Sequence, residues 1–86
     1  MPADLAESLK RILAAQLGPS YPPRYFNDDT PLLGAIPELD SMAVVGILTA
    51  VEEELGVTVD DDEISADLFE TFGSMASFLT QRKARV

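Results

Sequence analysis

Five prolines interrupt the chain between residues 18 and 40 and separate its helical patterns into two groups. They stand at Pro19, Pro22, Pro23, Pro31 and Pro37. Proline lacks a backbone N–H and clashes with the preceding helical turn, so this segment cannot form a helix. It is also longer than most connections between elements, and such loops are usually functional or disordered. The sequence therefore predicts one helix before residue 18, a long loop, and further helices after residue 40.

The long loop carries large apolar side chains, which a freely disordered linker would rarely contain. These side chains are Tyr25, Phe26, Leu32, Leu33 and Ile36. We therefore expect the loop to be held partly against the core.

Apolar residues recur at helical spacing before the loop and predict a first helix over about residues 4–17. The recurring residues are Leu5, Leu9, Ile12, Leu13 and Leu17. Asp4 is a suitable N-cap for this helix, and Gly18 is a suitable residue to end it.

A second helix is expected over about residues 41–55, because Asp40 is a favoured N-cap and Gly56 a favoured C-terminal stop. With about 100° per residue, one arc of this helix is apolar and predicts its buried stripe. That stripe contains Val44, Ile47, Leu48, Val51 and Leu55. The opposite arc contains Met42, Val45, Gly46, Thr49, Glu52 and Glu53.

The opposite arc of the second helix combines apolar and acidic side chains. An outward face with both properties is typical of a docking surface, so Met42, Val45, Glu52 and Glu53 are candidate partner-binding residues. The alternative is that Met42 and Val45 simply contact the long loop.

The remaining chain predicts two more helices. A short third helix is expected over about residues 62–67, and a fourth over about residues 71–82, with Phe72, Met75, Ala76 and Leu79 facing inward. A chain of 86 residues allows one domain. We therefore expect an all-α fold over residues 1–86, a small four-helix bundle whose third helix is short.

Charge and composition argue against several classes of function. Six basic and fifteen acidic residues give a net charge of −9, and thirteen of the acids lie between residues 25 and 81, where no base occurs. Nucleic acids and anionic membranes require clustered basic side chains, so neither is expected as a partner. Without histidine or cysteine, the chain lacks the usual groups for proton transfer and nucleophilic attack, and no catalytic residues are expected.

The first residues and the uncharged run of the second helix indicate whether the chain is expected to be secreted or inserted in a membrane. The first residues lack the positive start and apolar core of a secretory signal, and the uncharged run from Met42 to Val51 is too short to cross a bilayer. We therefore expect a cytoplasmic monomer without membrane insertion. The acidic surface keeps a small domain in solution, and a basic protein surface is its natural complement.

Ser41 lies directly behind the expected N-cap of the second helix. It could be an ordinary first-turn residue, which is common at this position. The same geometry also suits a modification, because unpaired N–H groups and the helix dipole would favour a phosphoryl group esterified to this serine. The long loop leaves room for a modifying enzyme.

The sequence LDSM opens a helix that ends in VEEELGV, in an acidic chain with a long preceding loop. Over nearly its whole length, the chain resembles an acyl carrier protein. The resemblance implies that 4'-phosphopantetheine from coenzyme A is attached to Ser41 and that its terminal thiol holds acyl groups as thioesters. It also implies that Asp40 assists the phosphopantetheinyl transferase and that the second helix is the main recognition element.

Several residues depart from the family pattern. Glu38 stands where glycine is frequent, Met42 where leucine is usual, and Ala43 and Gly46 where acids are common. These departures favour a specialised carrier over the housekeeping carrier of fatty acid biosynthesis. The expected partners are a transferase and a dedicated acyl ligase, synthase or acyltransferase with a basic or apolar docking surface.

Two other functions remain open. The chain could be an unmodified acidic helical interaction module, which would share the fold and charge of a carrier. It could also bind calcium through DDDE at residues 60–63, but an EF-hand frame that begins at Asp60 places Ile64 and Ser65 where a ligand and a glycine are needed. No metal site is therefore expected.

Overall fold

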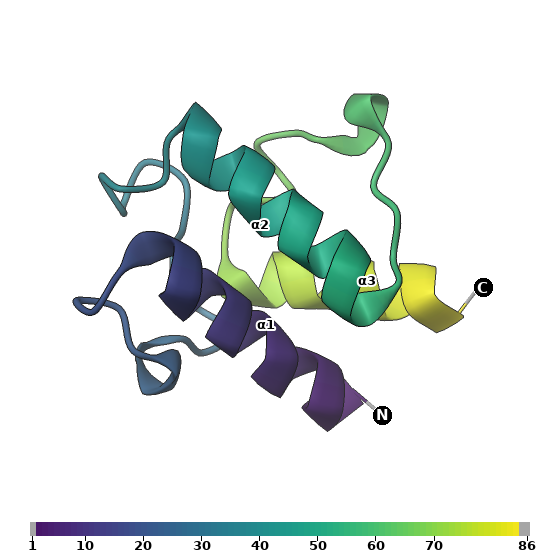
Figure 1. Cartoon of the computed structure of the whole chain (residues 1–86), viewed down its shortest axis with the longest axis horizontal. Helices are drawn as coiled ribbons and strands as arrows, with labels where there is room; N and C mark the ends of the chain where they lie inside the picture. The colour runs from purple at the N-terminus through teal and green to yellow at the C-terminus, as the bar shows by residue number, and fades with distance from the viewer. Residues whose placement is uncertain (1, 85–86) are drawn as a thin grey trace.

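The computed structural model describes residues 2–84. In chain order its elements are α1 (Pro2–Leu17), the 3-10 helix η1 (Pro23–Tyr25), α2 (Ser41–Leu55), the 3-10 helix η2 (Asp61–Glu63) and α3 (Phe72–Ala84). Figure 1 shows α1 and α2 side by side and running in opposite directions, with α3 behind α2. The loop that joins α1 to α2 lies at one end of this bundle.

The described residues are all-α as predicted, with three α-helices and no strand, but the helix expected over residues 62–67 is not present. This region contains η2 and the turns that follow it. The acidic run offers η2 no apolar stripe to bury, and the hydroxyl of Ser65 accepts the backbone N–H of Leu68 at 3.4 Å. Such a side-chain bond to the backbone favours a turn over a helix.

Both ends of α2 lie where the sequence predicts them. The Oδ1 atom of Asp40 accepts the backbone N–H of Ala43 at 2.9 Å, which confirms Asp40 as the N-cap. Gly56 follows the helix with a φ of 69°, a left-handed conformation that glycine adopts without a Cβ penalty.

The other two α-helices differ from the predicted bounds by a few residues. α1 ends before Gly18 as predicted, but it begins at Pro2, so Asp4 lies inside the helix and is not its N-cap. Proline suits a first helical position because its missing N–H is not needed there. α3 begins after Thr71, whose hydroxyl and backbone exchange hydrogen bonds with those of Ser74 at 3.0 and 3.1 Å. This reciprocal pair satisfies two backbone donors at the beginning of the helix.

The core lies between the three α-helices and the loop segments. In α2 the predicted buried stripe is confirmed at Ile47, Val51 and Leu55, while Val44 and Leu48 are half-buried at its edge. The largest fully buried side chains are Phe26, Phe72, Leu9, Leu13, Leu32, Ile36, Ile47, Met75, Leu79, Val51 and Val57.

The α1–α2 loop is held to the segment that leads into α3. The backbone N–H groups of Leu32 and Leu33 donate to the carbonyl oxygens of Glu70 and Phe69, at 3.0 and 2.9 Å. The loop side chains of Leu32 and Phe26 are buried, as expected, whereas that of Leu33 is exposed. The loop is therefore held by backbone hydrogen bonds as well as by its apolar side chains.

The same loop also closes the beginning of α3. The N–H groups of Phe72 and Gly73 donate to the carbonyl oxygens of Thr30 and Asp28, at 2.8 and 3.0 Å. A helix leaves its first N–H groups without intrahelical partners, and here the loop supplies two carbonyl oxygens as acceptors. A segment far away in the sequence thus serves as part of the helix cap.

Candidate functional site

Ser41 is the first residue of α2, and it is exposed to solvent. Asp40 closes the first turn with its own side chain, so the Ser41 hydroxyl is not needed as a cap. The first backbone bond of the helix joins the N–H of Val44 to the carbonyl oxygen of Asp40 at 2.9 Å. Unpaired N–H groups of this turn and the helix dipole create a positive potential beside Ser41. An exposed hydroxyl at such a position fits attachment of an anionic phosphodiester.

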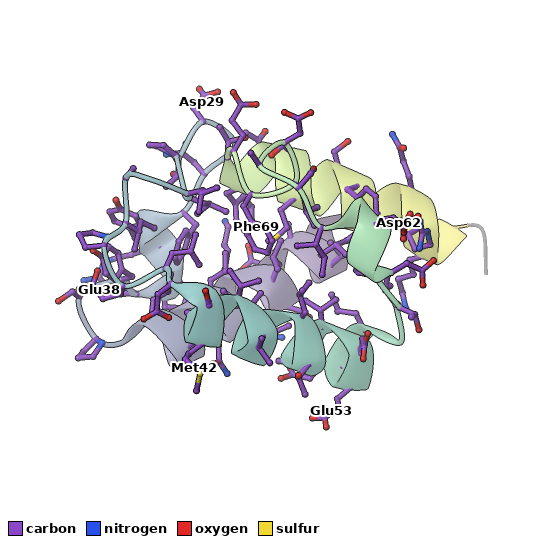
Figure 2. All side chains as sticks on the ribbon, turned by 90° about the horizontal axis from the view of Figure 1, so that it is seen from above. Asp29, Glu38, Met42, Glu53, Asp62 and Phe69 are labelled. Atoms are coloured by element: carbon purple, nitrogen blue, oxygen red, sulfur yellow. The ribbon has the colours of Figure 1, made fainter. Side chains whose placement is uncertain are left out.

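The outward face of α2 begins beside Ser41. Met42 is 80% exposed and Val45 is 63% exposed, so the loop covers neither side chain. Glu52 and Glu53 are exposed near the other end of the helix. Figure 2 shows Met42 and Glu53 pointing away from the bundle at opposite ends of α2. The predicted combination of apolar and acidic side chains therefore faces solvent.

Gly46 is the exception on the predicted outward arc, because it is half-buried. A Cβ atom at Gly46 would lie 2.2 Å from Oε1 and 2.9 Å from Cδ of Gln16 in α1. The Gln16 carboxamide thus lies against the bare backbone of α2, and the expectation that residue 46 faces solvent freely is wrong. A glycine inside a helix costs stability and often marks such a close approach, so a signal for this contact was present in the sequence.

A second contact missed by sequence reasoning supports the segment that precedes Ser41. The phenol of Tyr21 donates a hydrogen bond to the carboxylate of Glu38 at 2.7 Å. This bond, with partial burial and the nearby negative charge, raises the pKa of Tyr21 above 10.0, because each disfavours the ionised phenol. The Tyr21 ring also packs edge-on against Tyr25, with centroids 5.2 Å apart. The bond between Tyr21 and Glu38 thereby joins the beginning of the loop to its end.

The C-terminal end of α2 carries three glutamates in sequence, Glu52, Glu53 and Glu54, which oppose the helix dipole. Lys83 of α3 offsets part of this cost, since its Nζ atom donates to the carbonyl oxygen of Leu55 at 2.9 Å. α3 therefore supplies the cation that the last turn of α2 lacks.

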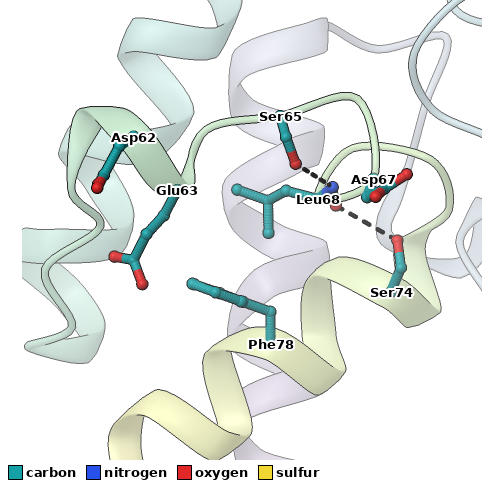
Figure 3. Close-up of a pocket in the computed structure, with 7 residues that line it drawn as sticks. All are labelled: Asp62, Glu63, Ser65, Asp67, Leu68, Ser74 and Phe78. Atoms are coloured by element: carbon teal, nitrogen blue, oxygen red, sulfur yellow. Dashed lines mark hydrogen bonds between the residues drawn. The ribbon is translucent and has the colours of Figure 1, made fainter.

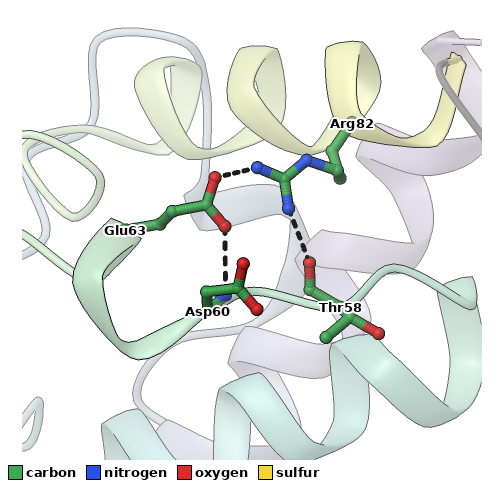
Figure 4. Close-up of polar contacts among 4 residues, drawn as sticks. All are labelled: Thr58, Asp60, Glu63 and Arg82. Atoms are coloured by element: carbon green, nitrogen blue, oxygen red, sulfur yellow. Dashed lines mark hydrogen bonds and ion pairs between the residues drawn. The ribbon is translucent and has the colours of Figure 1, made fainter.

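Arg82 fixes the segment that follows α2 (Figure 4). Its guanidinium donates to the carbonyl oxygen of Thr58 at 2.9 Å and forms an ion pair with Glu63. Glu63 in turn accepts the backbone N–H of Asp60 at 3.0 Å. This network holds η2 against α3, so one of the acids expected to face solvent has a structural role.

A cavity of about 410 Å³ lies between η2, the following turns and α3 (Figure 3). It is lined by Asp62, Glu63, Ser65, Asp67, Leu68, Ser74 and Phe78. The two serine hydroxyls bond the backbone of Leu68 and stabilise the turn. Among the described residues, no three His, Cys, Asp or Glu side chains are placed to hold a metal ion.

Of the described α-helices, α1 is the longest, with 16 residues. Within residues 2–84, none of them combines the length and apolar character that a membrane span requires.

Comparison with known proteins finds a family match and a similar solved structure. The family model described as the phosphopantetheine attachment site matches residues 7–79. The solution structure of a holo acyl carrier protein from Nitrosomonas europaea is similar to this chain, with 46% sequence identity and a TM-score of 0.81. The similarity covers 92% of this chain and 95% of that one. Among curated proteins, no significant match was found.

The family match covers most of the chain, with all of α2 and parts of α1 and α3. The similar structure shares the fold over nearly the same length. The protein is thus a carrier, not a catalyst, and its cofactor is covalently bound 4'-phosphopantetheine. The chain belongs to the acyl carrier protein family of phosphopantetheine attachment domains.

Proposed function

We propose that Ser41 is the attachment site and that the chain, as one domain over residues 1–86, presents acyl groups to partner enzymes. The observation that carries this proposal is that Ser41 is exposed in the first turn of α2. Asp40, and not Ser41, provides the side-chain cap of this turn. When bound, the arm supplies the thiol that this sequence lacks and holds the acyl group as a thioester. The chain itself provides the anchoring hydroxyl and a positive helix end for the phosphodiester.

Asp40 has two roles in this proposal. Its carboxylate fixes the first turn, in which Ser41 is exposed, through the N–H of Ala43. It is also exposed beside Ser41, where it can assist the phosphopantetheinyl transferase that installs the arm.

The partners proposed for the loaded carrier are acyl ligases, synthases or acyltransferases of specialised acyl metabolism in the cytoplasm. Glu52 and Glu53, with the net charge of −9, favour approach of a basic surface. Met42 and Val45 offer apolar contact close to Ser41. Contact near the reacting group would thus be mainly apolar, and charge would act mainly further along α2.

Coexpression with a broad-specificity phosphopantetheinyl transferase tests the attachment. The intact mass should increase by roughly 340 Da, the mass of one arm on a modified serine. Ser41→Ala should fold and remain unmodified, whereas Ser77→Ala, at an exposed serine of α3, should be modified like the unaltered chain. A mass increase in Ser41→Ala would show that another residue carries the arm.

The unmodified interaction module is the alternative, because it shares the fold and the outward face of α2. If the unaltered chain, Ser77→Ala and Ser41→Ala all keep their apo mass with an active transferase, this alternative is favoured. Formation of a hydroxylamine-sensitive acyl adduct on the holo protein would instead support the carrier role.

A further inference from the structure

Met42, Gly46, Thr49 and Glu53 share one ridge of α2, because helical residues three or four positions apart lie on the same face. Met42, Thr49 and Glu53 are exposed, whereas Gly46 is half-buried and has no side chain. The ridge therefore lacks a side chain of its own one turn beyond Met42.

Gln16 fills this position from the last turn of α1. Its Oε1, Cδ and Nε2 atoms lie 2.2, 2.9 and 3.5 Å from where a Cβ of residue 46 would stand. The carboxamide lies against the surface of α2, and the residue as a whole is exposed. A side chain from α1 thus completes the outward face of α2.

The chemistry of a carboxamide differs from that of the side chains on either side. It is neutral and can both donate and accept hydrogen bonds. The face is apolar at Met42 and Val45 and acidic at Glu52 and Glu53. Gln16 therefore places an uncharged polar group between the apolar and acidic parts of this face.

We infer that Gln16 determines which enzymes this carrier accepts, by placing a neutral hydrogen-bonding group over Gly46 in the middle of the docking face. The partner that fits has an apolar hollow for Met42 and Val45, an uncharged polar group opposite Gln16, and basic side chains opposite Glu52 and Glu53. An enzyme with a cation opposite Gln16 finds no charge there and binds less tightly. The inference rests on the proposed function, since it requires that enzymes dock on α2.

Two matched substitutions test this role with a phosphopantetheinyl transferase that has a basic docking surface. Gln16→Glu adds a charge to the docking face, and Gln81→Glu adds the same charge on an exposed part of α3. Gln16→Glu should lower KM for the apo chain by about 1.5- to 5-fold with kcat unchanged, as expected for one exposed charge pair. Gln81→Glu should change KM less. Equal effects of the two substitutions would overturn the inference, because they would reflect net charge alone.

A Gly46→Ala background tests whether Gly46 holds the side chain in place. The added Cβ displaces the end of residue 16, so the KM effect of Gln16→Glu should fall to that of Gln81→Glu. An unchanged effect in this background would contradict the role assigned to Gly46. Melting temperatures of all variants identify any that are not folded.

Side-chain amide NMR signals test the contact in the unaltered chain. The sequence contains three residues with such groups, Gln16, Asn27 and Gln81. On titration with the transferase in the absence of coenzyme A, the Gln16 signals should shift or broaden, and the Gln81 signals should not. If Ser41 is modified while the Gln16 signals do not respond, the inference fails and the carrier function stands. If Ser41 is never modified, the proposed function fails first.

Discussion

The backbone N–H of Gly73 donates a hydrogen bond to the carbonyl oxygen of Asp28 at 3.0 Å and joins the first turn of α3 to the α1–α2 loop. A Cβ atom at Gly73 would lie 2.6 Å from this oxygen and 3.1 Å from the Cα atom of Asp28. Both neighbours are backbone atoms and cannot move aside as the end of a side chain can. The loop that leads to Ser41 therefore depends on a residue without a side chain in α3.

Gly73→Ala should lower the free energy of unfolding by about 1–3 kcal/mol, because the added methyl group forces the loop away from α3. Urea unfolding followed by circular dichroism measures the change. Gly46→Ala is the matched control, since its methyl group meets only the flexible end of Gln16. Equal losses for the two substitutions would contradict the account of the loop contact.

The Tyr21 phenol should titrate above pH 10.0, because its hydrogen bond to Glu38 stabilises the neutral form. The stabilisation is fully present below pH 10.0, the value for the unfolded chain, and is lost as the pH rises through the higher folded value. Tyrosinate absorbance in a Tyr25→Phe background isolates Tyr21. Adding Glu38→Gln should move its pKa back towards 10.0, and no movement would show that Glu38 is not the cause.

Lys83→Met should lower the free energy of unfolding by about 0.5–1.5 kcal/mol, because the last turn of α2 loses a charged hydrogen-bond donor at Leu55. Methionine keeps most of the apolar stem. Arg11→Met provides the comparison, because exposed Arg11 bonds only to Ser8 of its own helix among the hydrogen bonds seen here. Thermal melts of both variants should show the larger loss for Lys83→Met, and the reverse order would be evidence against this cap.

Salt should raise the melting temperature of the chain. Thirteen acids lie between residues 25 and 81 without a base, and their repulsion is screened as ionic strength increases. Relief of about 1 kcal/mol would raise Tm by about 4–8 °C for a domain of this size. Magnesium chloride and sodium chloride at equal ionic strength separate ion binding from screening. No increase between low and moderate salt would mean that repulsion is negligible beside packing.

Local signals in the sequence predicted α2 well. Asp40 and Gly56 each act through contacts within a few residues, so their roles as N-cap and C-terminal stop follow from residue type alone. The beginning of α1 carried a comparable signal in Pro2, which suits a first helical position, but Asp4 was the stronger candidate by residue type. The prediction of a short helix over residues 62–67 was wrong, because an acidic run has no apolar stripe to bury.

Glycine at position 46 signalled a close approach, but the sequence did not show which distant residues meet. The exposed position of Met42 followed from helical spacing, and so did the acidic end of its face. The bond between Tyr21 and Glu38, and the placement of Gln16 over Gly46, depend on how the loop and α1 pack against α2. Periodicity within one element carries no information about that packing. The outward face of α2 was therefore predictable, whereas the contacts around it were not.

The most direct test of the account is to locate the phosphopantetheine arm by tandem mass spectrometry of the holo chain. Six serines could in principle carry it, namely Ser8, Ser20, Ser41, Ser65, Ser74 and Ser77. We expect one arm, on the peptide that contains Asp40 and Ser41, with fragment ions that place it on Ser41. An arm on any other serine, or none after treatment with an active transferase and coenzyme A, would contradict it.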